Sequence, residues 1–209
     1  MKIEVHPHPQ LQLRCFVTEF SEGIKNLTTP PEVLELFALN ASAPFESSDA
    51  IRKTTRDMLR VCGFKPTGRS KPAAEYLIKA VEKGILSAIN VPVDICNAVS
   101  LHSGIPISVV DCDLLTEPLR VRPAEKETRY VFNASGQEMD IGGLLCLWDA
   151  KGPCANAVKD SQRTKTNPQT KRVLTLMWGT QDLAQRVQQV ETWYRSLLEP
   201  FGALVDVEL

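Results

Sequence analysis

The spacing of apolar residues changes near residue 104, and this change constrains the fold more than any other feature. Before it, apolar residues recur at the three- to four-residue spacing of amphipathic helices. After it, alternation and short apolar runs indicate strands. A further helical stripe follows Thr180. Helices, then strands, then a closing helix predict a mixed α/β (α+β) fold, and 209 residues suit one such domain.

Each expected helix has start and stop signals of its own. The clearest is at residues 91–103, where Asn90 can cap the first turn, Pro92 suits it, and Gly104 ends the helix. The predicted helices span residues 32–39, 49–61, about 72–83, 91–103 and about 181–199.

Strands are predicted at residues 11–17, 107–112, 119–122, 128–133, 144–148, 173–178 and 204–207. We expect most of them to form a central sheet, mostly antiparallel or mixed, with the C-terminal helix packed on it. Residues 1–28 are expected to be an N-terminal extension that contains one strand, and residues 29–209 to be the domain itself.

The overall charge does not favour a general binder of polyanions. The chain has 24 Lys and Arg against 25 Asp and Glu, a formal net charge of −1. Proteins that bind nucleic acid without selectivity usually carry a basic excess. Any nucleic-acid contact therefore requires basic residues gathered locally, and we expect no DNA partner.

No part of the sequence predicts export or membrane insertion. Residues 1–12 lack the basic and apolar regions of a secretory signal, and the longest apolar stretch, at 142–148, is too short to span a bilayer. The six cysteines include no CxxC pair and are expected to be reduced core thiols. We therefore expect a cytoplasmic protein with no membrane partner.

Residues 63–70 have the spacing of a phosphate-binding loop without its context. Arg69 stands where lysine is required, Pro66 removes an amide donor, and a helix instead of a strand precedes the segment. A basic turn between two helices is the better prediction, in which Lys65, Arg69 and Lys71 could contact a phosphate as point charges.

Two further kinds of catalytic site find no support. Cys96 and His102 share a helix, but six residues turn a helix through about 600°, so the two side chains face different directions. No GxSxG motif occurs, and the three histidines lack the spacing of zinc sites. We expect neither a metal nor a cofactor.

The most basic stretch is residues 159–172, with five cations among hydroxyl side chains. Two interpretations remain open: a solvated loop, or contact with phosphates and the end of a tRNA, which would reconcile a neutral protein with a polyanionic partner. The residues proposed for phosphate contact are Lys159, Ser161, Arg163, Thr164, Lys165 and Arg172.

Asn97 lies on an apolar face of the helix predicted at 91–103. A buried amide needs a hydrogen-bond partner, so Asn97 is either a satisfied core residue or a pocket residue that meets a ligand. Asp94, in the first turn of the same helix, is explained by the helix dipole.

Residues 90–111 resemble the signature of the B3/B4 domain of the phenylalanyl-tRNA synthetase β subunit. The flanking segments 60–77, 119–122 and 160–164 resemble stand-alone B3/B4 proteins, so the similarity covers about residues 56–180. The positions that match the signature in register are Val93, Asp94, Asn97, Val99, Leu101, Gly104, Pro106 and Asp111.

The resemblance implies a pocket between a helix and a sheet. In the synthetase this pocket hydrolyses tyrosine wrongly esterified to the tRNA for phenylalanine, without a metal. By position, Asn97 matches the asparagine that lines the pocket, Cys96 replaces a threonine and Ser108 replaces a histidine. The implied substrate pocket comprises Asp94, Cys96, Asn97 and Ser108, in which Asn97 and Ser108 would be catalytic by positioning the attacking water.

Three functions follow as alternatives. The first is a tRNA-binding domain that acts as a trans-acting editing hydrolase of mischarged aminoacyl-tRNA. Ser108 lacks the proton-carrying ability of histidine, so the second is a non-catalytic module that binds tRNA or an amino-acid-like ligand. The third is an interaction protein or unrelated small-molecule enzyme on the same scaffold.

Overall fold

All 209 residues are described by the structure, a computed structural model of the chain. It confirms the mixed α/β fold class. None of the helices combines the length and the apolar character that crossing a bilayer requires.

The helices are α1 (Pro31–Glu35), α2 (Asp49–Arg60), α3 (Ala73–Glu82), α4 (Val91–Ser103) and α5 (Ala184–Leu198). The strands are β1 (Ile3–Val5), β2 (Leu11–Glu19), β3 (Ile107–Asp111), β4 (Leu119–Pro123), β5 (Arg129–Val131), β6 (Glu138–Asp140), β7 (Leu145–Asp149), β8 (Gly152–Asn156), β9 (Arg172–Thr180) and β10 (Ala203–Asp206).

The strands divide between two four-stranded sheets and a separate hairpin, where the sequence suggested one central sheet. The first sheet has the order β10-β2-β9-β3 and is antiparallel throughout. The second has the order β1-β4-β7-β8, with β1 parallel to β4 and the other pairs antiparallel. The strand of the N-terminal extension, β2, lies inside the first sheet and pairs with β9 along its whole length.

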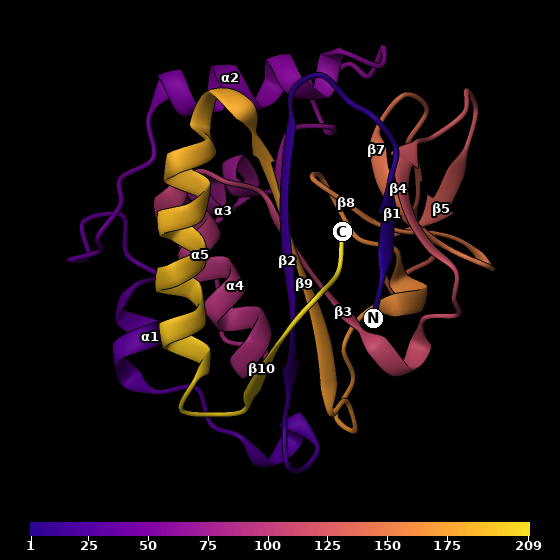
Figure 1. Ribbon diagram of the computed structural model, residues 1–209. Helices are drawn as coiled ribbons and strands as arrows, with labels where there is room; N and C mark the ends of the chain where they lie inside the picture. The colour runs from indigo at the N-terminus through magenta and orange to yellow at the C-terminus, as the bar shows by residue number, and fades with distance from the viewer.

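Two hydrophobic cores lie on opposite faces of the first sheet. Helices α4 and α5 cover one face, and the second sheet lies on the other side (Figure 1). Successive residues of a strand point to opposite faces, so β9 contributes to both cores: Trp178 belongs to the core shared with the second sheet and Met177 to the core under the helices. This alternation holds the three layers together.

Helix α4 spans the predicted residues because both of its ends carry local signals. Asn90 Oδ1 accepts a hydrogen bond from the Val93 N–H at 3.1 Å, and Gly104 ends the helix in the left-handed conformation with φ of 73°. The helix packs against α3, α5 and β3 and is buried on nearly all sides. Asp94, Ser100, His102 and Ser103 each have hydrogen-bond partners in the surrounding segments.

All six cysteines are free and five are buried, as predicted for reduced core thiols. Burial raises the pKa of Cys15, Cys112 and Cys154 to about 12. These thiols stay protonated, and therefore weakly nucleophilic, near neutral pH.

Candidate functional site

A cavity of about 320 Å³ opens between α3, α4, β3 and the segment that follows β8. Its wall is mostly apolar and includes Leu77, Ile107 and Val158. Two of the four predicted pocket residues, Cys96 and Asn97, line it, and we call it the Asn97 cavity. The hollow lies between a helix and a sheet, where the resemblance implied a pocket.

Two polar side chains in the wall of the Asn97 cavity have no partner in the protein. The amide of Asn97 is partly buried and makes no hydrogen bond to another residue. The hydroxyl of Tyr76, on α3, is buried and also unpaired. Buried polar groups are nearly always satisfied, and a few such groups orient a ligand in an otherwise apolar pocket. The Asn97 amide is therefore available to a polar part of a ligand, whereas the Tyr76 hydroxyl is occluded in the unliganded protein.

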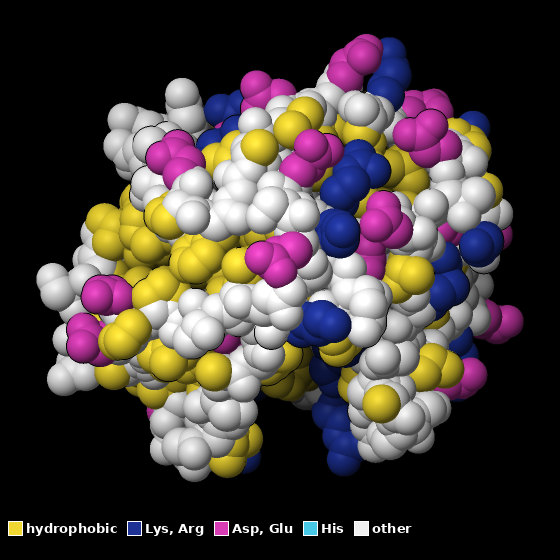
Figure 2. All heavy atoms as spheres, turned by 90° about the horizontal axis from the view of Figure 1, so that it is seen from below, with side chains coloured by type: hydrophobic (Ala, Val, Ile, Leu, Met, Phe, Trp, Pro, Cys, Tyr) yellow, Lys and Arg dark blue, Asp and Glu magenta, His cyan; other side chains and the backbone are white.

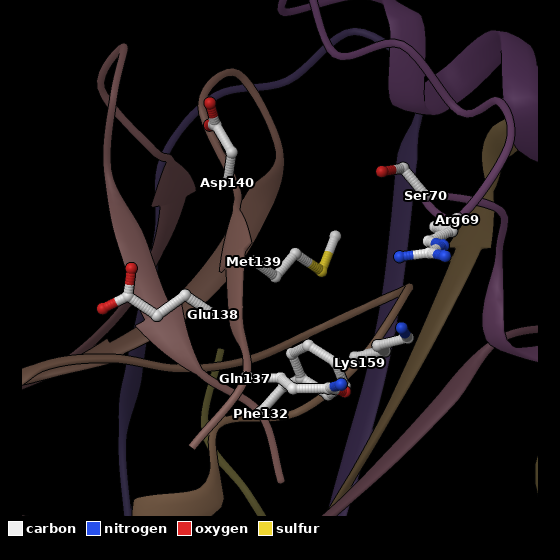
Figure 3. Close-up of a pocket in the computed structure, with 8 residues that line it drawn as sticks. All are labelled: Arg69, Ser70, Phe132, Gln137, Glu138, Met139, Asp140 and Lys159. Atoms are coloured by element: carbon white, nitrogen blue, oxygen red, sulfur yellow. The ribbon is translucent and has the colours of Figure 1, made fainter. Parts of the chain in front are cut away.

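A larger cleft of about 650 Å³ lies beside this cavity and shares Lys159 with it. One wall is the turn between α2 and α3, which supplies Arg69 and Ser70. The other is the β5–β6 hairpin, and the side chains of Arg69 and Lys159 extend into the space between the walls (Figure 3). We call it the hairpin cleft. Seen from below, the protein surface is notched at one edge, and Lys and Arg side chains gather in the notch (Figure 2).

Lys159 has aromatic neighbours and no carboxylate within ion-pair distance. Its Nζ lies 4.1 Å from the ring centroid of Phe132 and 5.2 Å from that of Tyr76. Burial, with Arg69 and Lys165 nearby, lowers the pKa of Lys159. The positive charge at this point is therefore incompletely compensated, and a bound anion would be stabilised there.

A buried polar network holds the turn that carries Lys159. Asn156 Oδ1 accepts hydrogen bonds from the backbone N–H groups of Val158 and Lys159, at 2.8 and 3.0 Å. The hydroxyl of Tyr130 donates to the carbonyl of Lys159. Side chains of β5 and β8 therefore fix the backbone position of Lys159.

Ser108 is buried and is not among the residues that line the Asn97 cavity. Its hydroxyl accepts a hydrogen bond from Trp178 Nε1 at 2.9 Å. The same hydroxyl can donate to Asp160 Oδ1 at 2.7 Å or to the Asn156 carbonyl at 3.1 Å. Burial raises the pKa of Asp160 to about 6. Ser108 therefore links β3 to β9 and to the segment after β8.

Asp94 also lies away from the Asn97 cavity. Its carboxylate accepts hydrogen bonds from Thr29 Oγ1 at 2.6 Å and from the Ile89 N–H at 2.8 Å, which fastens both segments to the first turn of α4. At the other end of α4, His102 Nε2 lies 2.7 Å from the carbonyl oxygen of Leu36. His102 is thus separate from Cys96, as the helical spacing indicated.

Most of the basic stretch at 159–172 bonds to the protein itself. Arg163 donates two hydrogen bonds to Asp149, of 2.9 and 2.8 Å, and Arg172 lies 3.2 Å from Glu19. Of the six residues proposed for phosphate contact, Lys159 is the one that lines the hairpin cleft. The other three bond to backbone groups: Lys165 Nζ to the Phe132 carbonyl, Thr164 Oγ1 to the Cys154 carbonyl, and Ser161 Oγ to the Arg163 N–H.

The sequence missed Tyr76 and Phe132 as site residues, and it missed the hairpin as one wall of a cleft. A usable signal was present: Asn133 and Gly136 mark a turn between two short segments of strand-like character. No group of three or more His, Cys, Asp or Glu side chains converges to hold a metal ion.

The sequence matches the model of one protein family. A family model described as the B3/4 domain matches residues 54–192. An N-terminal fragment of the phenylalanyl-tRNA synthetase β subunit from Pyrococcus horikoshii superimposes with a TM-score of 0.52 at 12% identity, covering 99% of this chain and 52% of that fragment. The chain thus spans about half the length of the fragment. The C-terminal domain of TILS superimposes with a TM-score of 0.32 at 17% identity, over 36% of this chain and 71% of that chain. No curated protein matches the sequence.

Proposed function

Since the chain belongs to the B3/4 domain family, we propose that it binds tRNA and takes the amino acid on the charged 3′ end into the Asn97 cavity. The observation that carries this proposal is the unpaired amide of Asn97 in the wall of an apolar cavity. The fold shared with a fragment of the phenylalanyl-tRNA synthetase β subunit supports a tRNA partner.

The chemistry of the cavity suits an aminoacyl group. Leu77, Ile107 and Val158 offer apolar surface to an amino-acid side chain, while the Asn97 amide offers hydrogen bonds to its polar atoms. A volume of about 320 Å³ is near the lower end of the usual range for small-molecule sites, about 300–1,000 Å³. The cavity therefore suits one amino acid better than a larger metabolite.

Binding without hydrolysis agrees best with the position of Ser108. Its proton is engaged by Asp160 or by the Asn156 carbonyl, and its oxygen already accepts from Trp178. A water activated by Ser108 would have to displace one of these partners. The non-catalytic alternative stated from the sequence therefore has direct geometric support.

Hydrolysis of a mischarged ester is a second candidate, favoured by one observation. Lys159 lines the cavity, where its ammonium can stabilise the oxyanion that forms when water attacks an ester. Water would add to the ester carbonyl, the bond from the acyl carbon to the ribose oxygen would break, and that oxygen would take up the proton.

The test compares one tRNA in two forms, uncharged and carrying an amide-linked tyrosine or phenylalanine at its 3′ end. We expect the wild-type protein to prefer the charged form by about tenfold, since a hydrogen bond and apolar burial are gained. Asn97→Ala should remove most of this preference, whereas Asn40→Ala, at an exposed loop position, should keep it. Equal affinity of the wild type for the two forms would overturn the proposal.

The hydrolysis candidate needs its own measurement with ester-linked tRNAs. Selective loss of one ester above the buffer rate, abolished in Lys159→Gln, would establish the reaction. Stable esters on all bound species would leave the protein a binding module.

A further inference from the structure

Arg69 and Lys159 are two cations without a carboxylate partner, although the chain has more acidic than basic residues. Arg69 is exposed on the turn between α2 and α3, and Lys159 is half-buried beyond β8. They come from segments 90 residues apart in the sequence, and their side chains extend into the same space (Figure 3). Two converging, uncompensated cations favour an anion between them.

The hairpin contributes two acidic residues, Glu138 and Asp140, to the lining of this cleft. In the β5–β6 register Tyr130 pairs with Met139, and both are buried, so Glu138 and Asp140 project from the opposite, exposed face. Glu138 lies 3.7 Å from Arg129, on the same face. Figure 3 shows Met139 directed into the cleft and Glu138 directed away from it. Asp140 Oδ1 accepts a hydrogen bond from the Gly142 N–H at 2.9 Å, and neither carboxylate forms an ion pair with Arg69 or Lys159.

The hairpin wall of the cleft and Lys159 are held in place before any ligand binds. Lys165 Nζ donates a 2.6 Å hydrogen bond to the carbonyl of Phe132, which fixes the end of the hairpin nearest Lys159. The ring of Phe132 then supports the Lys159 ammonium at 4.1 Å. Ser70 and Gln137 add neutral hydrogen-bonding groups to the lining. Lys159 thus differs from a mobile surface lysine, because its side chain has less freedom to lose on binding.

We infer that the hairpin cleft binds a phosphate group, with Arg69 and Lys159 as its charged donors. This inference rests on the proposed function, in which the phosphate is that of the nucleotide that carries the amino acid. Lys159 lines both hollows, so a single ligand can fill them together. A 3′-aminoacyl nucleotide has the required form, an amino acid joined through ribose to a 5′-phosphate. The terminal nucleotide of the tRNA is then the part that the protein recognises.

The test uses two fragments of that ligand, adenosine 5′-monophosphate and tyrosine amide, each titrated by NMR. Arg69→Gln should weaken the nucleotide about tenfold, as expected for loss of a charge-assisted hydrogen bond, and leave the amide unchanged, because Arg69 does not line the Asn97 cavity. Lys159→Gln should weaken both fragments. The control, Lys171→Gln at an exposed position outside both hollows, should weaken neither.

Two outcomes would overturn the phosphate subsite even if tRNA binds: equal affinity of adenosine and its 5′-monophosphate for the wild type, or nucleotide affinity unaffected by Arg69→Gln. The proposed function fails separately. The nucleotide could bind in the predicted way while tyrosine amide fails to bind and charged tRNA binds no more tightly than uncharged tRNA. That result would support the phosphate subsite and contradict the assignment of the Asn97 cavity to the amino acid.

Discussion

Ser108 occupies the position at which the B3/B4 signature has a histidine, and its hydroxyl lies between Trp178 and Asp160. Each of these partners comes from a segment more than 50 residues away. A side chain that satisfies a buried indole N–H and bonds to a carboxylate is constrained by the fold itself. Ser108 thus serves as a structural hydrogen-bonding residue between β3, β9 and the segment after β8.

Replacing Ser108 by alanine should therefore reduce stability and leave ligand binding unchanged. The Trp178 N–H and Asp160 would lose a partner in a buried region, at a cost of about 1–3 kcal/mol. Urea unfolding and the affinity for charged tRNA measure the two effects. Ser196→Ala, on the exposed side of α5, is the matched control and should change neither. If Ser108→Ala lost affinity for charged tRNA without losing stability, Ser108 would have a direct role in ligand binding, contrary to this prediction.

Asp160 should make stability depend on pH in an identifiable way. Its pKa is raised from 3.8 to about 6 by burial, so between these values the folded protein binds more protons than the unfolded chain and loses stability as pH rises. Asp160→Asn stays neutral and can still accept through Oδ1. We expect it to exceed the wild type at pH 7.5 by on the order of 1–2 kcal/mol, allowing for partial exposure. Urea unfolding should show this gain vanishing at or below pH 4; a gain independent of pH would contradict the assignment.

At the scale of elements, the turn between α2 and α3 matters because it carries Arg69 to the cleft. This turn rests on the loop before β7, where Gly143 has φ of +76° and no room for a side chain: a Cβ would lie 2.5 Å from the Cys62 carbonyl oxygen and 2.9 Å from the Phe64 nitrogen. Gly136, in the turn of the β5–β6 hairpin, has the same φ of +76° and open space around it.

These two glycines form a matched pair for alanine substitution. Gly136→Ala should lower the free energy of unfolding by about 1–2 kcal/mol, because alanine is strained in the left-handed conformation. Gly143→Ala should lower it by about a further 1–3 kcal/mol, the usual effect of overpacking. Urea unfolding of both variants measures the difference. Equal losses would show that the turn does not rest on Gly143.

How far the elements could be predicted depends on where their signals lie. Helix α4 was predicted to the residue because Asn90 and Gly104 mark its ends locally. Strand β8 was missed because it begins with Gly152 and Pro153 and lacks alternation, while β1 and β6 have only three residues each. Asn97 was identified from its place on α4. The hairpin cleft arises from contacts between distant segments, and no local pattern encodes it.

At the scale of the whole molecule, a net charge of −1 limits how a polyanion can be bound. Most cations of the stretch at 159–172 bond internally, and the hairpin cleft offers Arg69 and Lys159. On the proposed function, affinity for tRNA would come from a few phosphates and from the amino acid. The expectation from the sequence that basic residues must be gathered locally thus fits the cleft, although its location could not be predicted.

The salt dependence of tRNA binding should consequently be shallow. With about two phosphates contacted in a single-stranded end, log K should fall with log salt concentration with a slope of about −1 to −2, and Arg69→Gln should reduce it by roughly 0.7. Fluorescence titrations across a range of salt concentrations provide this slope. A slope steeper than about −4 would mean that the body of the tRNA is bound as well.

The most direct measurement is a crystal structure of the protein with a 3′-amide-linked tyrosyl adenosine 5′-monophosphate, which cannot be hydrolysed as an ester. We expect the tyrosyl group in the Asn97 cavity with a hydrogen bond to the Asn97 amide, and the phosphate between Arg69 and Lys159. Density for the tyrosyl group outside this cavity, with the cavity unchanged, would contradict the central claim that the cavity receives the amino acid of a charged tRNA.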